Sequence, residues 1–378
     1  MKSEWTFRSL GELVNFSSGG TPSKRKSEYW TGNIPWISAK TLKSERITTS
    51  DLFISEDGLN AGSKLAPCGS ILLLTRGSGL FNGIPMGLVE KEVAFNQDIK
   101  CLDSCSEIEN KFIFYYLLSQ CDYLMAKVDV TGIGAGKFDL DFLKKLEVPI
   151  PSERERLQII AIGDALSDKI ELNQKINENL ERQAQAIFKA WFTDGKAANG
   201  CLADICQYSK EKVAVSSLNL DNYYSTENML PGKAGATQAA NLPTTAQATR
   251  CKTGDVLVSN IRPYFKKIVY SYEDCGCSTD VLCFNPKQKE LSDYLFFVLY
   301  ADSFFDFMVA GSKGTKMPRG DKQQIMMYPV YVPSDGELTE FNNIAQPILM
   351  QIRLNREENK RLIALRDTLL PKLMAGEI

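Results

Sequence analysis

Side chains that bind phosphate and read base edges recur along this chain, whereas the residues of common catalytic sites are missing. None of the 378 residues is histidine. A Ser-His or Cys-His nucleophile pair and a histidine general base are therefore excluded. Lysine, arginine, asparagine and serine gather instead with aromatic residues on segments rich in turn-forming residues. These residue types contact phosphates and base edges, so the pattern favours nucleic-acid binding.

The candidate binding residues fall on polar segments in both halves of the chain. For any one of them, an ordinary surface position is an equally good interpretation. The candidates of the first half are Lys24, Arg25, Lys40, Arg76, Ser78 and Lys137. The candidates of the second half are Tyr223, Asn260, Arg262, Tyr264, Lys266, Lys313, Lys316 and Arg319.

The overall charge argues against a generic polyanion binder, because the net charge is −2 and the isoelectric point is near 5.6. Local patches partly answer this objection. Lys313, Lys316, Arg319 and Lys322 have only Asp321 as an acidic neighbour in the sequence. We expect such patches to contact phosphates, while a partner supplies part of the positive surface.

Two motifs resemble metal and nucleotide sites without matching them. Cys251, Cys275, Cys277 and Cys283 lack the spacing of a zinc ribbon, and reduced, partly buried thiols are the simpler interpretation. The segment from Thr131 to Phe138 has threonine in place of the first glycine of a phosphate-binding loop and phenylalanine in place of its Ser/Thr. We therefore predict no metal and no cofactor.

The elements that position these loops change in character along the chain. Residues 1–150 alternate short apolar runs with turn signals, which predicts a mixed domain of short strands. Phe112–Met125 is predicted to be a buried helix. Ser152 is a predicted N-cap, followed by a long helix to Phe192. A second long helix is expected after Ser334, with a break or kink at Pro347.

Both long helices carry the apolar spacing of a coiled-coil seam, averaging about 3.5 residues. Asn173 and Asn355 are predicted to fix register and orientation within it. The alternative is that each helix packs only on its own domain. The predicted seam residues are Leu166, Ile170, Asn173, Ile176, Leu180, Ile187, Ile348, Ile352, Asn355, Leu362 and Leu369.

The chain repeats itself at an offset of 182 residues. Without a gap, Asp98 matches Asp280, Asp139 matches Asp321 and Asn177 matches Asn359. Such a long period indicates two copies of a whole domain with its trailing helix. The upstream parts agree less well, as expected of one scaffold that carries two recognition tasks.

The chain resembles the specificity subunit of type I restriction-modification systems over essentially its full length. The residues that carry the resemblance are Leu10–Leu13, Ser17–Ser23, Tyr29–Ser38, Ile71–Gly77, Ala94–Ile99, Val148–Ser152 with the following helix, and Pro371–Glu377. One departure is the stretch from Tyr208 to Thr249, which lacks the Gly-Gly-Thr-Pro block of the first copy.

The resemblance implies an α+β fold with two mixed α/β target-recognition domains in a pseudo-two-fold arrangement. Two long antiparallel coiled-coil helices would separate these domains. Each domain would read one half of a bipartite, asymmetric DNA site across a fixed gap. The subunit would be non-catalytic and would bind double-stranded DNA, two adenine methyltransferase subunits and restriction/translocase subunits.

We expect target-recognition domains at 1–151 and 201–333, helical regions at 152–194 and 334–378, and a linker at 195–200. The sequence has no apolar run of the roughly 20 residues that a membrane span needs, so a cytoplasmic location is expected. Two alternatives stay open. One is a repeated-domain coiled-coil scaffold that binds proteins, and the other is a fused nuclease or methyltransferase. The second is disfavoured because no complete catalytic motif is found.

Overall fold

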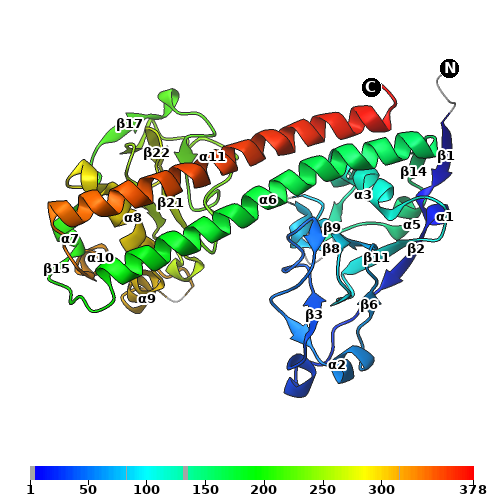
Figure 1. Cartoon of the computed structure of the whole chain (residues 1–378), viewed down its shortest axis with the longest axis horizontal. Helices are drawn as coiled ribbons and strands as arrows, with labels where there is room; N and C mark the ends of the chain where they lie inside the picture. Colours follow the sequence, from blue (N-terminus) through cyan, green and yellow to red (C-terminus); the bar gives the residue numbers. More distant parts are fainter. Residues whose placement is uncertain (1–4, 82, 131–134, 315) are drawn as a thin grey trace. The chain divides into compact units, whose positions relative to one another are not determined.

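Two contact units, each with its own core, make up the chain. In this computed structural model the described residues are 5–81, 83–130, 135–314 and 316–378. Unit 1 comprises Met1–Gln174 and Arg356–Ile378, and unit 2 comprises Lys175–Asn355. Both units combine short strands with helices (Figure 1), which confirms the predicted α+β class.

Unit 1 contains a five-stranded sheet in the order β2-β11-β7-β9-β4 and a four-stranded sheet in the order β5-β3-β10-β6. A three-stranded sheet, β12-β13-β8, and the pair β1-β14 complete it. Its strands are β1 Thr6–Ser9, β2 Val14–Ser18, β3 Ile34–Ile37, β4 Arg46–Ile47, β5 Phe53–Ile54, β6 Leu65–Ala66, β7 Ile71–Leu74, β8 Arg76–Gly77, β9 Met86–Val89, β10 Val93–Phe95, β11 Ile99–Ser104, β12 Asp129–Val130, β13 Gly136–Lys137 and β14 Glu147–Ile150. Its helices are α1 Leu10–Leu13, η1 Ser27–Trp30, α2 Glu56–Asn60, η2 Ser78–Phe81, α3 Asn110–Ser119, α4 Cys121–Met125, α5 Leu140–Lys144 and the first part of α6 Glu153–Phe192.

Unit 2 repeats part of this plan, with sheets in the orders β16-β23-β20-β21 and β17-β19-β22-β18 and the pair β15-β24. Its strands are β15 Gly200–Cys201, β16 Cys206–Tyr208, β17 Lys212–Ala214, β18 Tyr223–Tyr224, β19 Gln247–Cys251, β20 Val256–Ser259, β21 Ile268–Tyr270, β22 Cys275–Cys277, β23 Val281–Pro286 and β24 Pro329–Val330. Its helices are the second part of α6, α7 Leu202–Ile205, η3 Val215–Ser217, η4 Pro263–Phe265, η5 Lys289–Leu291, α8 Ser292–Tyr300, α9 Asp302–Ala310, α10 Lys322–Met326 and the first part of α11 Asp335–Met374. The last part of α11 belongs to unit 1.

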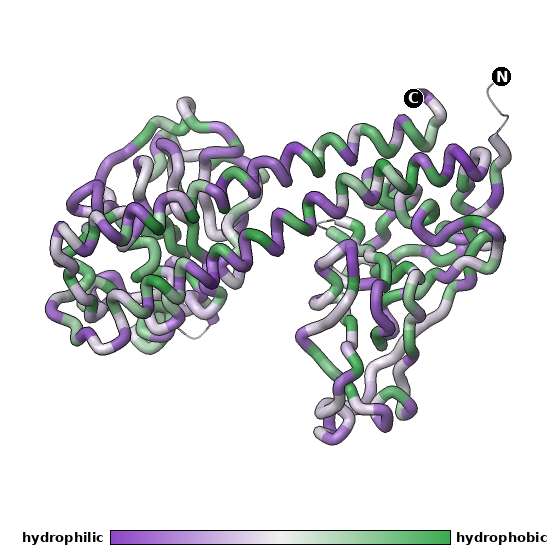
Figure 2. The backbone as a smooth tube through the Cα atoms, viewed as in Figure 1, coloured by the Kyte–Doolittle hydropathy of each residue, from purple (hydrophilic) through white to green (hydrophobic). Residues whose placement is uncertain are grey.

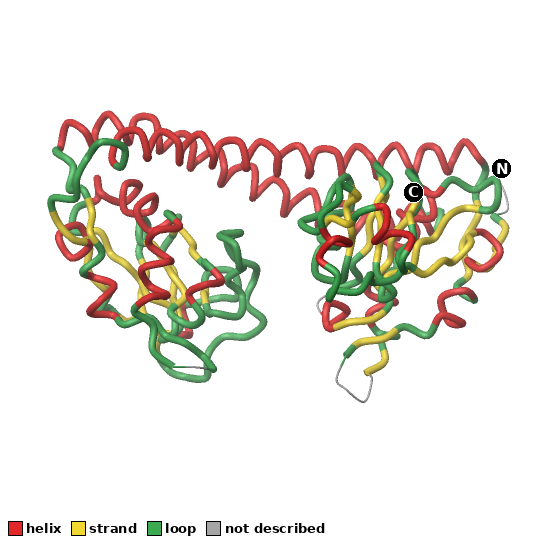
Figure 3. The backbone as a smooth tube through the Cα atoms, turned by 90° about the horizontal axis from the view of Figure 1, so that it is seen from below, coloured by secondary structure: helices red, strands yellow, loops and turns green. Residues whose placement is uncertain are grey.

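The core of each unit joins its sheet to both long helices. In unit 1, the fully buried strand β7 packs with α3, with Ile159 and Ile160 of α6, and with Leu370 and Met374 of α11. Gly163 lets α6 approach closely, because a Cβ there would stand 2.6 Å from the Tyr115 ring. In unit 2, Phe192 of α6 and Phe341 of α11 pack together with α8. Within each unit the long helices run along one side of the strands (Figure 3).

Both long helices begin with the same capping box. The Ser152 N–H donates to Glu155 at 2.9 Å, and the Glu155 N–H donates back to the Ser152 hydroxyl at 3.4 Å. Ser334 and Glu337 repeat these contacts at 2.8 and 3.4 Å. The predicted N-cap of α6 is therefore confirmed, and its counterpart lies 182 residues later.

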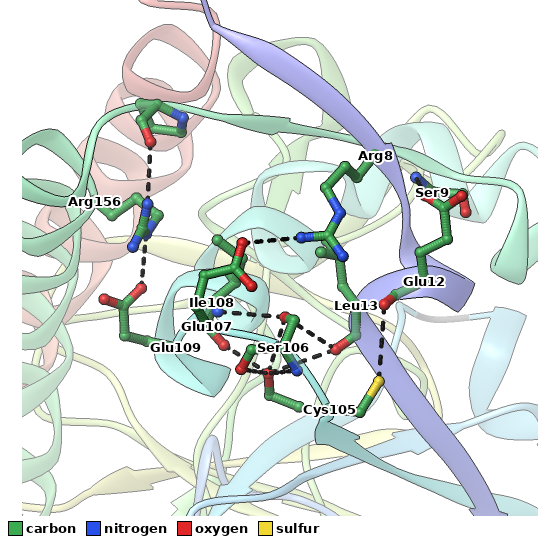
Figure 4. A network of polar contacts seen from close by, with 12 residues as sticks. Arg8, Ser9, Glu12, Leu13, Cys105, Ser106, Glu107, Ile108, Glu109 and Arg156 are labelled. Carbon is green, nitrogen blue, oxygen red and sulfur yellow. Dashed lines mark hydrogen bonds and ion pairs between the residues drawn. The ribbon is translucent and has the colours of Figure 1, made fainter.

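A polar network ties the start of α6 to the segment before α3 (Figure 4). The buried Arg156 donates to Glu109 at 2.8 Å and to the Pro151 carbonyl at 3.1 Å. Nearby, Arg8 of β1 pairs with Glu107 at 3.0 Å. The first turn of α6 is thus held against the segment that precedes α3.

Two adjacent residues at the sheet edge bind both long helices in unit 1. Glu45 accepts from Arg366 of α11 at 2.6 and 2.7 Å. Arg46 of β4 pairs with Asp168 and, at 3.5 Å, with Asp164, both on α6. Because the Arg46 and Arg366 side chains are nearly buried, water screens these ion pairs less than it screens surface pairs.

Polar and apolar residues alternate along both long helices (Figure 2), and the buried positions follow a seam that contains four asparagines. In unit 1, Asn173 donates to Asn359 at 2.8 Å, and Asn359 donates to the Ile170 carbonyl at 3.1 Å. In unit 2, Asn355 donates to Asn177 at 2.8 Å, and Asn177 donates to the Ile352 carbonyl at 3.3 Å. Within each unit α6 and α11 are therefore antiparallel.

The structure corrects three details of the predicted helices. Ile176 is 37% exposed, and the next residue, Asn177, occupies the seam because it pairs with Asn355. Pro347 does not break α11, which runs without interruption from Asp335 to Met374, and the kink at this position stays a prediction. The helix predicted over Phe112–Met125 is divided at Gln120 into α3 and α4.

The remaining seam predictions divide between full and partial burial. Ile170, Asn173, Ile352 and Asn355 are buried. The partly exposed members are Leu166, Leu180, Ile187, Ile348, Leu362 and Leu369. Leu349 and Leu370, each directly after a predicted seam residue, are buried instead.

No helix among the described residues is long and apolar enough to span a membrane. Cys251, Cys275, Cys277 and Cys283 come together in one small core of unit 2. Within the described part of the chain, however, no group of three or more His, Cys, Asp or Glu side chains is arranged to hold a metal ion. The loop that begins at Thr131, which partly resembles a phosphate-binding loop, lies outside the described residues up to position 134.

Candidate nucleic-acid interface

In unit 1, the fold brings four of the candidate residues to one place, the end of the buried strand β7. We call residues 75–78 and 135–138 the basic platform of unit 1. Arg76 of β8 and Lys137 of β13 are direct cross-strand partners. Ser78 follows at the start of η2. The turn that contains Ala39 and Lys40 borders the platform, because a Cβ added to Gly77 would lie 3.7 Å from the Cβ of Ala39.

Backbone hydrogen bonds hold this platform in place. Thr75 and Arg76 both donate N–H to the Asp98 carbonyl, at 2.9 and 3.2 Å. Phe138 is buried in the core and donates to the Thr75 carbonyl at 2.9 Å. Successive side chains of a strand point to opposite faces, so burial of Phe138 turns Lys137 toward solvent.

Unit 2 builds a basic platform at the corresponding strand end, after the buried β20; we define it as residues 260–262, 313–314 and 316–320. Asn260 donates N–H to the Asp280 carbonyl at 2.8 Å, as Thr75 does to Asp98. Arg319 forms backbone bridges to Ile261 and Lys313. Arg262 donates N–H to the Pro318 carbonyl at 2.8 Å.

Two buried polar atoms of this second platform have no hydrogen-bond partner among the described residues. They are the amide oxygen of Asn260 and the Nε of Arg262. Buried polar atoms are normally hydrogen-bonded, so unpaired ones need an explanation. An asparagine amide and an arginine guanidinium are also groups that hydrogen-bond base edges. Both atoms are shielded from solvent, however, and Asn260 as a whole is only 7% exposed, so a ligand reaches them only if the platform opens.

Several cations of unit 2 form ion pairs within the chain. Arg319 pairs with Asp280 at 3.0 Å, Lys313 with Asp321 at 2.6 Å and Lys266 with Asp302 at 2.8 Å. Lys313 and Arg319 have largely exposed side chains. Exposed pairs contribute at most about 1 kcal/mol, so a phosphate competes readily for these cations.

The lysine partners lower the pKa of two of the carboxylates in these ion pairs. The hydrogen bond from Lys313 is the main cause that lowers the pKa of Asp321, followed by two backbone N–H groups of α10. Hydrogen bonds from Lys233 and Lys266 lower the pKa of Asp302. Both carboxylates are therefore charged at neutral pH and orient the lysines beside them.

The remaining candidate residues are divided between the second platform and places outside both platforms. Lys24 and Arg25 occupy the turn before η1, whose Trp30 packs edge-on against Trp36 in a separate small core. Lys316 is exposed in the second platform, and Tyr264 lies on the neighbouring η4. Tyr223 is only 5% exposed and packs in the core with Leu218, which removes it from the binding surface. Its place between turn residues in the sequence gave no sign of this burial.

Sequence reasoning missed two exposed aromatic residues beside the platforms. Phe81 ends η2 and is 45% exposed, and Phe265 ends η4 and is 39% exposed. The available signal was an arginine followed within five residues by phenylalanine in both halves, at Arg76 and Arg262.

The family model of the type I restriction modification DNA specificity domain matches residues 2–182. The chain is 32% identical over 184 residues to the EcoR124I/EcoR124II type I restriction enzyme specificity subunit of Escherichia coli, covering 48% of this chain and 44% of that protein. It is 29% identical over 202 residues to the MjaIX specificity subunit of Methanocaldococcus jannaschii, covering 50% and 44%. The chain thus spans less than half the length of these relatives.

A solved structure extends the likeness to the whole chain. The S subunit of a type I restriction-modification system from M. genitalium superposes with a TM-score of 0.51 at 17% identity, covering 98% of this chain and 96% of that one. At this identity the likeness concerns the fold. The resemblance predicted from the sequence is confirmed: residues 2–182 belong to the type I restriction modification DNA specificity domain family, and the chain has the fold of a type I S subunit.

Proposed function

We propose that this chain is the DNA sequence-specificity subunit of a type I restriction-modification complex. Unit 1 reads one half of a bipartite, asymmetric site, and unit 2 reads the other. One observation carries the proposal: each unit places a cationic platform at the end of its buried central strand, held by the carbonyl of Asp98 or Asp280. A shared scaffold with different exposed side chains is suited to two different half-sites.

The two platforms offer different chemistry for recognition. That of unit 1 presents Arg76 and Lys137, which suit phosphates and guanine. That of unit 2 presents the exposed Lys313, Lys316 and Arg319 on a loop instead of on two paired strands. We therefore expect the two half-sites to differ in sequence.

The outer faces of the long helices support docking of partner subunits. Exposed leucine and isoleucine side chains recur on both helices at the repeat offset, at Ile162 and Ile344 and at Leu172 and Leu354. Two similar apolar faces suit two copies of one partner, for which we propose the adenine methyltransferase. Restriction/translocase subunits would join this complex, and catalysis would reside in the partners. With a net charge of −2, this chain alone offers little overall attraction for DNA, and such partners would add positive surface around the duplex.

The decisive experiment co-expresses the chain with the adenine methyltransferase subunit of its own restriction-modification system and maps adenine methylation across the genome. We expect a bipartite motif that appears only when both proteins are present. A matched variant with Arg76→Ala, Lys137→Ala and Arg319→Ala should form the same complex and lose the motif.

A stable complex that produces no motif would refute the proposed function. Binding of the purified complex to DNA gives an independent check. Specific binding through cationic platforms should weaken steeply with salt, because phosphate contacts release counterions. A protein-binding scaffold would show no such salt-dependent association with DNA.

A further inference from the structure

A short 3-10 turn follows the basic platform in each unit and carries an exposed aromatic ring. In unit 1, η2 follows Arg76 and Gly77 and ends at Phe81. In unit 2, η4 follows Arg262 and contains Tyr264, which is 50% exposed, and Phe265. The same kind of element therefore stands beside the phosphate-binding cations twice in one chain.

The backbone of η4 is braced from both sides. Arg262 and Lys266 flank it with φ angles of 50° and 51°, in the left-handed region that residues other than glycine rarely adopt. Gly232 donates N–H to the Phe265 carbonyl at 2.8 Å, and Lys233 donates to that of Lys266 at 2.9 Å. Strained backbone of this kind persists where the surroundings hold it and gathers at functional sites.

The turn in unit 1 is braced differently, through its own side chain. Leu80 is buried in the main core next to the exposed Phe81. Gly136 of the platform leaves room for it, since a Cβ there would stand 2.9 Å from that of Leu80. The ring of Phe81 is thus held at the surface by an anchored neighbour.

Single exposed apolar residues are common and need no explanation by themselves. These two differ because both follow a platform arginine in the sequence and both sit on a braced turn. Phe265 has the Lys267 ammonium 5.9 Å from its ring centroid. An apolar group held beside phosphate-binding cations fits a DNA duplex better than an apolar protein surface.

We propose that Phe81 and Phe265 are wedges that insert between base pairs, one at each half-site, and unstack a base step. This inference rests on the proposed function and deepens it. Apolar wedges kink the duplex at a cost that depends on the step, and pyrimidine–purine steps open most easily. The wedges would therefore add sequence preference at positions where no side chain hydrogen-bonds a base.

The test uses the complete complex with its methyltransferase and a duplex that carries the methylation motif found for the wild-type complex. Binding is measured for Phe265→Ala, Phe265→Leu and Phe265→Tyr, with Phe81→Ala as the mirror variant. Lys189→Ala, an exposed change on α6, is the control. We expect Phe265→Ala to lose about tenfold or more in affinity, as removal of an aromatic–base stack does, with Tyr retaining most of it.

A second measurement isolates the wedge from simple surface contact. Duplexes with a single abasic position are scanned through the half-site read by unit 2. One position should restore the binding of Phe265→Ala, because the base stack that the ring must open is already broken there. 2-Aminopurine at the same step should brighten with the wild-type complex and not with Phe265→Ala.

The outcomes separate the two proposals. A wild-type complex without any motif refutes the proposed function together with the wedges. A normal motif with Phe81→Ala and Phe265→Ala binding as tightly as wild type overturns the wedges alone. So does a loss of affinity that no abasic position restores, because ordinary surface contact would explain it. Unchanged thermal unfolding of each variant excludes a folding defect, since both rings are exposed.

Discussion

Arg319 occupies the centre of the second basic platform. Its backbone bridges both Ile261 and Lys313, while its guanidinium pairs, among the residues that the structure describes, with the surface carboxylate of Asp280. The backbone therefore carries the structural role, and the side chain is available for a ligand. This division makes Arg319 a sharp probe of recognition.

Arg319→Ala should weaken binding to the half-site read by unit 2 by about 1–3 kcal/mol. Folding stability should change little, because the lost ion pair is exposed. Affinity is measured on duplexes in which one half-site at a time is scrambled, with Arg76→Ala as the matched change in unit 1. Equal losses at both half-sites from either variant would contradict two separate readers.

At the level of single residues, sequence patterns found the platform cations but not their neighbours in space. Arg76 and Lys137 are 61 positions apart, and only the pairing of β8 with β13 puts them side by side. Local composition carries no information on such pairing. The prediction that Tyr223 binds DNA was wrong for the same reason. Its burial depends on packing against Leu218 and not on its polar neighbours in the sequence.

At the scale of the elements, the N-terminus of α11 is capped by a charged carboxylate. Glu337 caps the helix, and a hydrogen bond from Lys196, followed by those from Ser334, lowers its pKa to about 2. A lowered carboxylate pKa adds stability above the ordinary value of 4.5 that is lost as the pH falls toward 2.

Glu337→Gln should therefore lower the thermal midpoint at pH 7, and the difference from wild type should shrink between about pH 5 and pH 2. Glu340→Gln, an exposed change on the same helix, is the control. Thermal unfolding of both variants is followed across this range of pH. A difference that stays constant with pH would show that the capping charge contributes nothing.

The asparagine pairs of the seam give a second prediction for the elements. In unit 2, Asn177→Leu removes the acceptor of the buried Asn355 amide and should destabilise the fold by about 1–3 kcal/mol. The double change Asn177→Leu/Asn355→Leu should recover most of that loss, because no buried amide then lacks its partner. Denaturant unfolding of the two single variants and the double variant completes the cycle. Additive losses would mean that the two amides do not depend on each other.

The long helices were predictable because capping and periodicity are local. Ser152 and Ser334 mark both starts, and the 182-residue offset ties one to the other. The phase of the seam was not predictable at Ile176, because apolar preference selects isoleucine while pairing across the helices selects Asn177. Pro347 was expected to break or kink α11, which nevertheless runs without interruption from Asp335 to Met374.

For the whole molecule, we propose that the paired helices set the distance between the two half-sites. Insertion of seven residues into each helix, after Gln174 and after Asn355, preserves the seam and adds about 10 Å of helix. The gap in the methylated motif should grow by about three base pairs, at about 3.4 Å per pair, with both half-sites unchanged. Methylation mapping reads this directly. An unchanged gap would refute the spacer role, and insertion into one helix alone serves as the control that disrupts pairing.

At the scale of the whole molecule, the repeat at an offset of 182 residues predicted two domains, each followed by a long helix. The two units nevertheless divide inside the helices, because each core also includes the helix that trails the other copy: Leu370 of α11 in unit 1 and Phe192 of α6 in unit 2. A one-dimensional repeat cannot reveal this exchange of segments. This exchange depends on the antiparallel pairing of α6 with α11, which the hydrogen bond between Asn173 and Asn359 shows.

The discontinuity of unit 1 has a consequence for biogenesis. Unit 2 is one continuous segment, whereas the core of unit 1 includes Leu370 and Met374, which follow the whole of unit 2 in the chain. During synthesis, unit 2 can complete its contacts as it emerges, while unit 1 must wait with part of its apolar surface uncovered. Closing such a long loop is slow, and the waiting surface is prone to aggregate. Expression of this chain should therefore depend on chaperones that bind the exposed apolar surface of unit 1 until unit 2 and the end of α11 have been synthesised.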